Sequence, residues 1–165
     1  MALPAATGTP YRIAFVCLGN ICRSPMAEVI LTELVDDAGL ATEVEVSSCG
    51  TGTWHLGEPM DPRAAAQLLA KGYDASAHRA RKFDDTWLRQ DLVLAMDAKN
   101  LADITGGSGV SESVRMFRSF DPLAGPDDLD VPDPFYGGDD GFVEVIRIVE
   151  RTCRNILAEL EARLR

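Results

Sequence analysis

The sequence predicts an α/β fold: a single-domain, three-layer fold in which a four-stranded parallel sheet carries helices on both faces. Segments with strand character alternate with segments of helical character along the chain, which is typical of parallel strands joined by crossover helices. One strand candidate, Asp91–Met96, is continuously apolar after its first residue, as in strands that are buried on both faces. The length of 165 residues suits one domain with a sizeable core.

The first strand and the first helix are predicted from an apolar run and a helical stripe. Ile13–Val16 is apolar throughout, so we expect a buried strand at about Arg12–Val16. A helix from about Ser24 to Ala38 should follow, with Pro25 in its first turn and Gly39 as its stop. Its apolar stripe consists of Ala27, Ile30, Leu31, Leu34 and Val35.

The second strand and helix are predicted from alternation and from a capping residue. Val44 and Val46 alternate with polar residues, which indicates a strand at about Glu43–Ser47. After a loop, Asp61 is expected to cap a second helix that ends before Gly72.

The second half of the chain continues the alternation. The buried strand Asp91–Met96 should lead into a short helix that is capped by Asp97, and a fourth strand is expected at Val114–Phe117. The segment Asp121–Asp140 is rich in Asp, Gly and Pro, and such a long irregular loop in a compact domain is usually functional. A long amphipathic helix over about Asp140–Leu164 should close the fold.

Composition and charge exclude several classes of function. The chain is 46% apolar and 25% charged, as in globular proteins, and its formal net charge is −10. This charge argues against binding to nucleic acid or to an anionic membrane surface. No apolar run approaches membrane-spanning length. Residues 1–10 lack the features of a signal peptide and are expected to form a flexible lead-in to a domain that spans residues 11–165.

The four cysteines are Cys17, Cys22, Cys49 and Cys153. They show none of the paired spacings of zinc sites, and the chain has only two histidines, so we expect no metal and no other cofactor. A domain of this size needs no disulfide scaffold, so we expect reduced thiols in a cytoplasmic protein, with export without a signal peptide left open. We expect a monomer, with a weak dimer as the alternative.

The most informative stretch, VCLGNICRSP at residues 16–25, joins the first strand to the first helix. A loop before a helix N-terminus suits an anion, because its backbone N–H groups point inward and the helix end carries partial positive charge. Cys17 lies at the strand end, Arg23 follows six positions later, and Ser24 comes next. We call residues 17–24 the phosphate-binding loop, since these donors would hold three oxygens of a phosphoryl group.

Each residue type in this loop has a physical role. The thiolate is the nucleophilic form of Cys17, and the amides, the helix end and Arg23 would all favour it. The planar fork of Arg23 can also grip two oxygens at once. Gly19 allows a close turn, with a positive φ as one possibility, and Asn20 tolerates the left-handed region. Ser24 can donate a hydrogen bond to the sulfur. The alternative interpretation of the motif is a buried structural cysteine and a surface arginine in an ordinary turn between a strand and a helix.

The string from Val16 to Glu28, VCLGNICRSPMAE, resembles the motif of the low-molecular-weight protein tyrosine phosphatases. The resemblance extends over nearly the whole chain from about Arg12. It implies hydrolysis of protein phosphotyrosine and small aryl phosphates through a phosphocysteine intermediate on Cys17, without a metal. It also implies that Arg23 and its neighbours bind the phosphoryl group: Leu18, Gly19, Asn20, Ile21, Cys22 and Ser24.

A tyrosine leaving group needs a proton, so we expect a general acid on a loop that faces the thiol. The long loop contains VPDPFYG at residues 131–137, in which two prolines stiffen Asp133. Residue type alone leaves Asp133 open as a turn residue, because Asp beside Pro is common in turns. Similar strings in the family carry the general acid, and the resemblance implies this role for Asp133. This chain has Phe135 where many family members have Tyr.

Three aromatic side chains are expected to flank the mouth of the slot: Trp54, Phe135 and Tyr136. Such rings suit a phosphotyrosine ring, which can stack on them or meet them edge-on. Core packing is the alternative for Trp54, but the polar and glycine-rich segment around it favours an exposed loop.

Further residues are expected to support the loop from below. Ser48 and His78 resemble family positions that join Asn20 and Ser24 in a hydrogen-bond network, and a solvated surface histidine remains the alternative for His78. Asp97 is expected to be a structural cap rather than a catalyst. The basic stretch of Arg79, Arg81 and Lys82 is expected to be a solvated face.

Cys22 is the only cysteine close to Cys17 in sequence, and family behaviour implies that it forms a protective disulfide after oxidation of Cys17. The alternative is that Cys22 is a small buried residue that packs under the loop.

Two other functions of the whole protein remain as alternatives. An arsenate reductase of this fold usually needs two further cysteines near the third strand, and a non-catalytic phosphate-binding module would be expected to lose Cys17 or Asp133.

Overall fold

The computed structural model describes residues 2–164 and contains one four-stranded sheet, β1 (Tyr11–Cys17), β2 (Val44–Gly50), β3 (Leu92–Ala95) and β4 (Val114–Met116). The strand order is β2-β1-β3-β4 and each neighbouring pair is parallel. After β1 the chain forms β2 along one edge of β1, and it then crosses to the opposite edge of β1 to form β3. The gap between β1 and β3 is therefore the topological switch point, where α/β proteins place their ligands.

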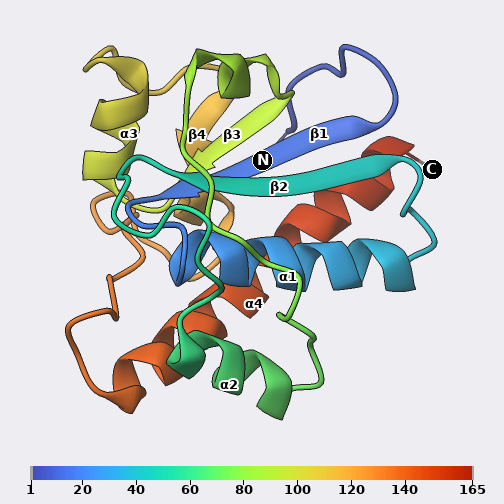
Figure 1. Ribbon diagram of the computed structural model, residues 1–165. Coiled ribbons are helices and arrows are strands. Elements are labelled where there is room, and N and C mark those ends of the chain that lie inside the picture. Colours follow the sequence, from blue (N-terminus) through green and yellow to red (C-terminus); the bar gives the residue numbers. More distant parts are fainter. Residues whose placement is uncertain (1, 165) are drawn as a thin grey trace.

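Four α-helices are described, α1 (Arg23–Asp37), α2 (Pro62–Ala70), α3 (Ala98–Thr105) and α4 (Asp139–Leu164), together with two short 3-10 helices at Asp85–Arg89 and Phe117–Phe120. Figure 1 shows α1 and α4 on one side of the sheet, with α2 beyond them, and α3 on the other side. The predicted three-layer arrangement is thus confirmed. None of the helices within residues 2–164 has the length and apolarity that a membrane crossing requires.

Alternation along the strands divides the core into two parts. Ile13 and Phe15 on β1 belong to a large cluster that includes residues of α1 and α4. Val16 on β1 and Val93 on β3 belong to a smaller cluster with Ile104 of α3. Successive side chains of a strand point to opposite faces, so the apolar runs of β1 and β3 contribute to both clusters.

The element boundaries lie within about two residues of those expected from the sequence, except at β2, which continues from the expected end at Ser47 to Gly50. Cys49 and Gly50 pair with the last two residues of β1. The apolar–polar alternation stops early because Ser48, although polar, is fully buried among hydrogen-bond partners. The two 3-10 helices have no counterpart among the expected elements.

The segment that precedes β1, expected as a flexible lead-in, contacts the domain at several points. Leu3 is buried, and the Tyr11 hydroxyl donates a hydrogen bond to the Pro4 carbonyl at 2.9 Å. The Thr7 amide and hydroxyl both donate to the Asp91 carboxylate, at 2.9 and 2.8 Å. These contacts connect the segment to the start of β1 and β3, and its mobility in solution stays a prediction.

Candidate active site

Cys17 ends β1 and lies at the base of the phosphate-binding loop. Its side chain is buried, and its sulfur lies 2.9 Å from the Ser24 hydroxyl oxygen. The helix α1 begins at Arg23, and the residue that precedes it makes no side-chain hydrogen bond to the first turn. The first N–H groups of α1 are therefore left without a side-chain cap, as in helix ends that bind anions.

Asn20 holds the shape of this loop. It is the one non-glycine residue with positive φ in residues 2–164, at 55°, and it is fully buried. Its amide nitrogen donates to the hydroxyls of Ser24 and Ser48 at 2.8 and 2.9 Å. Its side-chain oxygen accepts from the Arg81 amide at 2.9 Å. These bonds offset the cost of the left-handed backbone and hold the loop in one conformation.

Two glycines allow close approach at the loop, and neither has a positive φ. A Cβ on Gly19 would lie 3.2 Å from a ring carbon of His55, so this residue is small because a ring covers it. A Cβ on Gly50 would lie 2.7 Å from the Leu18 carbonyl oxygen. Gly50 thus lets the end of β2 approach the loop, a requirement that no local sequence pattern indicated.

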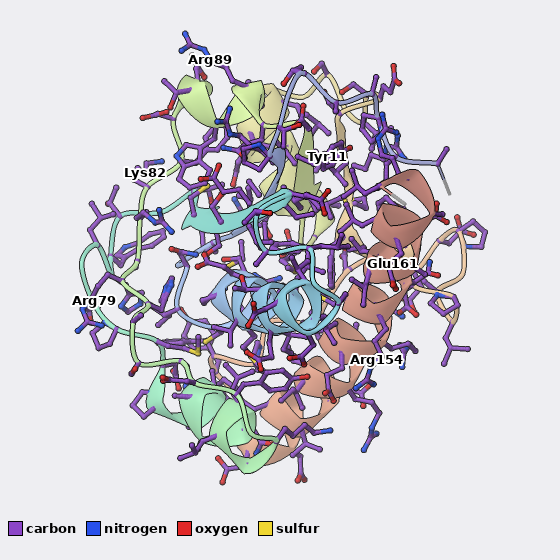
Figure 2. The ribbon with its side chains drawn as sticks, turned by 90° about the vertical axis from the view of Figure 1, so that its right-hand side faces the viewer. Tyr11, Arg79, Lys82, Arg89, Arg154 and Glu161 are labelled. Atoms are coloured by element: carbon purple, nitrogen blue, oxygen red, sulfur yellow. The ribbon has the colours of Figure 1, made fainter. Side chains whose placement is uncertain are left out.

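His78 lies beneath the loop and not in solvent. It is buried, and its Nε2 lies 2.7 Å from the Asn20 carbonyl oxygen. Burial lowers the pKa of His78 against the opposing effect of this hydrogen bond, so the ring is neutral at pH 7 and donates its proton to the carbonyl. Arg79 and Lys82 point outward at the edge of the molecule (Figure 2), in agreement with a solvated face.

Arg23 is oriented by contacts from two other segments. Only 3% of its side chain is exposed. Its Nη1 donates to the Asp97 carboxylate at 2.7 Å and to the Val131 carbonyl at 3.0 Å. Burial disfavours the charged guanidinium, but the Cys17 sulfur and the Asp97 carboxylate outweigh burial and raise the pKa of Arg23. Arg23 is therefore a fixed cation beside the sulfur.

Asp97 does more than the structural cap that its sequence position indicated. One carboxylate oxygen accepts from the Asn100 amide at 2.7 Å and caps α3. The other oxygen holds Arg23. The signal for this second role is its place two residues after the end of β3, because the carboxyl ends of β1 and β3 meet at the same edge of the sheet.

Asp133 reaches the same cavity from the long loop, although it lies 110 positions after Arg23. The Val131 amide donates to the Met96 carbonyl at 2.7 Å and attaches the loop to the end of β3. One Asp133 carboxylate oxygen lies 3.4 Å from Nη2 of Arg23, and the other accepts from the Phe135 amide at 3.1 Å. The Asp133 side chain is 35% exposed, so it can contact both a substrate and water.

A cavity of about 320 Å³ lies over the sulfur. It is lined by Cys17, Leu18, Gly19, Ile21, Cys22, Arg23, Trp54, His55, Asp133, Phe135 and Tyr136. Trp54 is 71% exposed and Tyr136 is 90% exposed, whereas Phe135 is half-buried and meets Tyr136 edge-on at 4.9 Å between ring centres. Trp54 is thus a wall of the cavity and not part of the core.

His55 was not among the expected site residues. It lines the cavity, its Nδ1 lies 3.0 Å from the Glu58 carboxylate, and its ring centre lies 5.7 Å from that of Phe135. The sequence signal that could have indicated it is its position directly after Trp54.

Cys22 lines the cavity with a buried side chain and forms no disulfide. Burial raises the pKa of its thiol, and the nearby Asp61 carboxylate acts in the same direction. Cys22 is therefore a neutral thiol.

Comparisons with known proteins agree with this geometry. The family model described as low molecular weight phosphotyrosine protein phosphatase matches residues 12–165. A low molecular weight protein-tyrosine-phosphatase of Streptomyces coelicolor is 49% identical over 152 residues, covering 90% of this chain and 92% of the relative. The crystal structure of YfkJ from Bacillus subtilis superposes with a TM-score of 0.86 at 32% identity, covering 97% of this chain and 100% of that chain.

Some solved relatives have a different named activity. The structure of a Drosophila arginine phosphatase superposes with a TM-score of 0.80 at 26% identity, covering 90% of this chain and 97% of that chain. The family model spans nearly the whole sequence, and the cysteine, the arginine and the long-loop aspartate meet in one cavity. The chain belongs to the low molecular weight phosphotyrosine protein phosphatase family.

Proposed function

We propose that this protein hydrolyses phosphotyrosine in proteins, and small aryl phosphates, through a phosphocysteine intermediate on Cys17. The observation that carries this proposal is the meeting of Cys17, Arg23 and Asp133 in one cavity with aromatic walls. The three residues supply a nucleophile, a fixed positive charge and a proton donor, which are the groups that the reaction needs.

In the first step the Cys17 sulfur attacks phosphorus, and the bond from phosphorus to the tyrosine oxygen breaks. Arg23 and the backbone N–H groups of the loop bind the equatorial oxygens, where charge develops in the transition state. Asp133 gives its proton to the departing oxygen. The orientation of Arg23 by Asp97 and Val131 means that no reorganisation is needed at this stage.

In the second step Asp133, now a carboxylate, accepts a proton from water while that water attacks the phosphocysteine. The sulfur leaves as a thiolate, and the Ser24 hydroxyl, 2.9 Å away, donates a hydrogen bond to it. Asn20 donates to the same hydroxyl oxygen, so the Ser24 proton is available for the sulfur, and its other acceptor, the Cys49 carbonyl, is more distant at 3.4 Å.

The walls of the cavity favour an aromatic phosphate ester. Trp54 and Tyr136 offer exposed ring surface, and the half-buried Phe135 lines the same cavity. A phosphotyrosine ring can contact these faces, whereas a phosphoserine side chain is too short to bring its phosphorus to the sulfur at the base. Substrate proteins bearing phosphotyrosine are therefore the proposed partners.

Other activities on this fold make different demands. The segment 82–103 contains no cysteine, so the usual pair for a disulfide relay in arsenate reduction is missing from its expected place. A non-catalytic phosphate-binding module needs neither a nucleophile nor an acid, yet both are present. Phosphoarginine hydrolysis, the activity named for the Drosophila relative, is separated from our proposal by comparing turnover of phosphoarginine with that of phosphotyrosine.

Replacing Asp133 with Asn should slow hydrolysis of aryl phosphates according to the basicity of the leaving group. Phenyl phosphate should lose about 10²–10⁴-fold in kcat/KM, which reports the first step alone, because phenolate leaves poorly without a proton. The kcat/KM of the p-nitrophenyl ester should fall much less, and the basic limb of the kcat/KM pH profile should flatten. Steady-state kinetics with both esters check this, and an equal loss on both would mean that Asp133 is structural.

The redox role of Cys22 gives a separate prediction. After peroxide oxidises Cys17 to the sulfenic acid, the Cys22 sulfur attacks it, the S–S bond forms, and the hydroxyl leaves as water with the Cys22 proton. Wild type should lose activity with peroxide and regain it with a thiol reductant. Cys22→Ser should regain much less, because its Cys17 oxidises further to irreversible products. Equal recovery of the two proteins would reject this role.

The proposed chemistry requires a reduced Cys17, and the cysteines within residues 2–164 are free and buried. This state suits a reducing compartment, so we propose that the protein works in the cytoplasm.

A further inference from the structure

Arg63, in the first turn of α2, was not expected to belong to the site, yet it joins the two loops that carry the chemistry. We call residues 131–138 the acid loop. Arg63 does not line the cavity that holds Cys17. Its guanidinium contacts Asp61 on one side and the acid loop on the other. It therefore lies in a position to set the distance between Asp133 and the phosphate-binding loop.

The first half of this connection runs through Asp61. The Asp61 amide donates to the carbonyl of Ile21, within the phosphate-binding loop, at 2.9 Å. The Asp61 carboxylate is buried, caps α2 through the Arg63 amide at 2.8 Å, and accepts from Nε and Nη2 of Arg63 at 3.2 and 3.0 Å. A two-pronged pair of this kind fixes the plane of the guanidinium.

The second half runs from the guanidinium to the acid loop. Nη2 of Arg63 donates to the Phe135 carbonyl at 2.9 Å, and Nη1 donates to the Gly137 carbonyl at 3.1 Å. The guanidinium carbon lies 4.6 Å from the ring centre of Phe142, at the start of α4. The Phe135 amide donates to Asp133, so the residue that Arg63 holds in turn holds the proposed acid.

The remaining contacts of the acid loop show why Arg63 is needed. Its start is held by the Val131 amide and carbonyl, which bond to Met96 and Arg23. Beyond Asp133, the backbone bonds of the loop are local: the Gly137 amide donates to the Pro134 carbonyl, and the Gly138 carbonyl accepts from Gly141 in the adjoining first turn of α4. Within residues 2–164, Arg63 is the only side chain outside the loop that donates hydrogen bonds to the backbone of residues 134–138.

We propose that Arg63 is a positioning residue for the general acid: it couples the acid loop to the phosphate-binding loop and holds Asp133 over the leaving oxygen. This inference rests on the proposed phosphatase function and deepens it. Arg63 touches no reacting atom, and its effect reaches the reaction only through Asp133. Loss of Arg63 should therefore reproduce the kinetic pattern that loss of Asp133 produces, at smaller size.

The test is Arg63→Gln, assayed with phenyl phosphate and p-nitrophenyl phosphate. We expect kcat/KM for phenyl phosphate to fall by about 10–10²-fold, because a displacement of about 1 Å in a reacting group can cost that much. The kcat/KM for the p-nitrophenyl ester should change little, because kcat/KM reports only the first step, in which the leaving group departs. The exposed Arg147, whose one ion pair is with Glu144, provides the matched control Arg147→Gln, which should change neither rate.

A double-mutant cycle with Asp133→Asn makes the test decisive. If Arg63 acts through Asp133, adding Arg63→Gln to Asp133→Asn should cause no further loss on phenyl phosphate. Losses that multiply, or an equal loss on both esters in the single variant, would overturn the proposal. So would a single variant with unchanged rates on both.

A second variant covers the case in which Arg63→Gln does not fold, judged by circular dichroism. Arg63→Lys keeps the charge beside Asp61 but can reach only one of the two loop carbonyls. It should show the same selective loss on phenyl phosphate, and wild-type rates on both esters would overturn the proposal. Metal-free turnover of p-nitrophenyl phosphate by wild type, lost in Cys17→Ser, tests the phosphatase function separately, so the two failures are distinguishable.

Discussion

Replacing Cys17 with Ser should abolish turnover while leaving the fold intact. A serine hydroxyl is nearly the size of the thiol and can keep the contact with Ser24 that is now 2.9 Å long. It remains protonated at neutral pH, so it attacks phosphorus poorly. We expect kcat on p-nitrophenyl phosphate to fall by at least about 10³-fold, as for other enzymes that lose their nucleophile.

The structural control for this variant is its thermal melting temperature, with and without inorganic phosphate. The phosphate-binding loop is held by Asn20 and Ser48, not by the sulfur, so phosphate should still raise the melting temperature of Cys17→Ser. If the variant still binds phosphate but does not turn over substrate, the substitution has removed the nucleophile and left the anion-binding site intact. Activity above a few per cent of wild type would contradict the assignment of Cys17.

Replacing Arg23 with Lys should lower kcat on the order of 10²–10³-fold, the usual cost of removing one donor to a developing charge. Nη1 of Arg23 donates to the Asp97 carboxylate and to the Val131 carbonyl, and these two bonds orient the rest of the guanidinium toward the cavity. A lysine ammonium cannot keep those two bonds and also grip two phosphoryl oxygens, because it lacks the planar arrangement of donors. Steady-state kinetics on p-nitrophenyl phosphate measure this loss.

The matching control is Arg147→Lys on the exposed face of α4, which should leave kcat unchanged. Inorganic phosphate should protect Arg23→Lys from thermal unfolding less than it protects wild type, because the ground-state anion uses the same donors. A near-normal kcat for Arg23→Lys would mean that the phosphoryl group lies elsewhere in the cavity.

The parts of the fold that depend on local pattern were predictable. Apolar runs gave β1 and β3, and Asp61 caps α2 as expected. Local pattern did not indicate polar burial: Ser48 and His78 were expected beneath the loop only through the family resemblance, because the hydrogen bonds that bury them follow no periodicity. The expectation that Gly19 could need a positive φ was wrong, because Asn20 takes that conformation and Gly19 instead makes room for a ring.

The sequence by itself determined the half of the site that is contiguous in the chain. Cys17, Arg23 and Ser24 lie within eight positions between a strand and a helix, so their approach follows from local geometry. The tertiary structure decided everything that reaches this loop from afar: Asp97 on Arg23, and Arg63 between the loops. Contacts between residues separated by 40 to 110 positions depend on strand order and loop attachment, and a single sequence does not specify these through any short-range pattern.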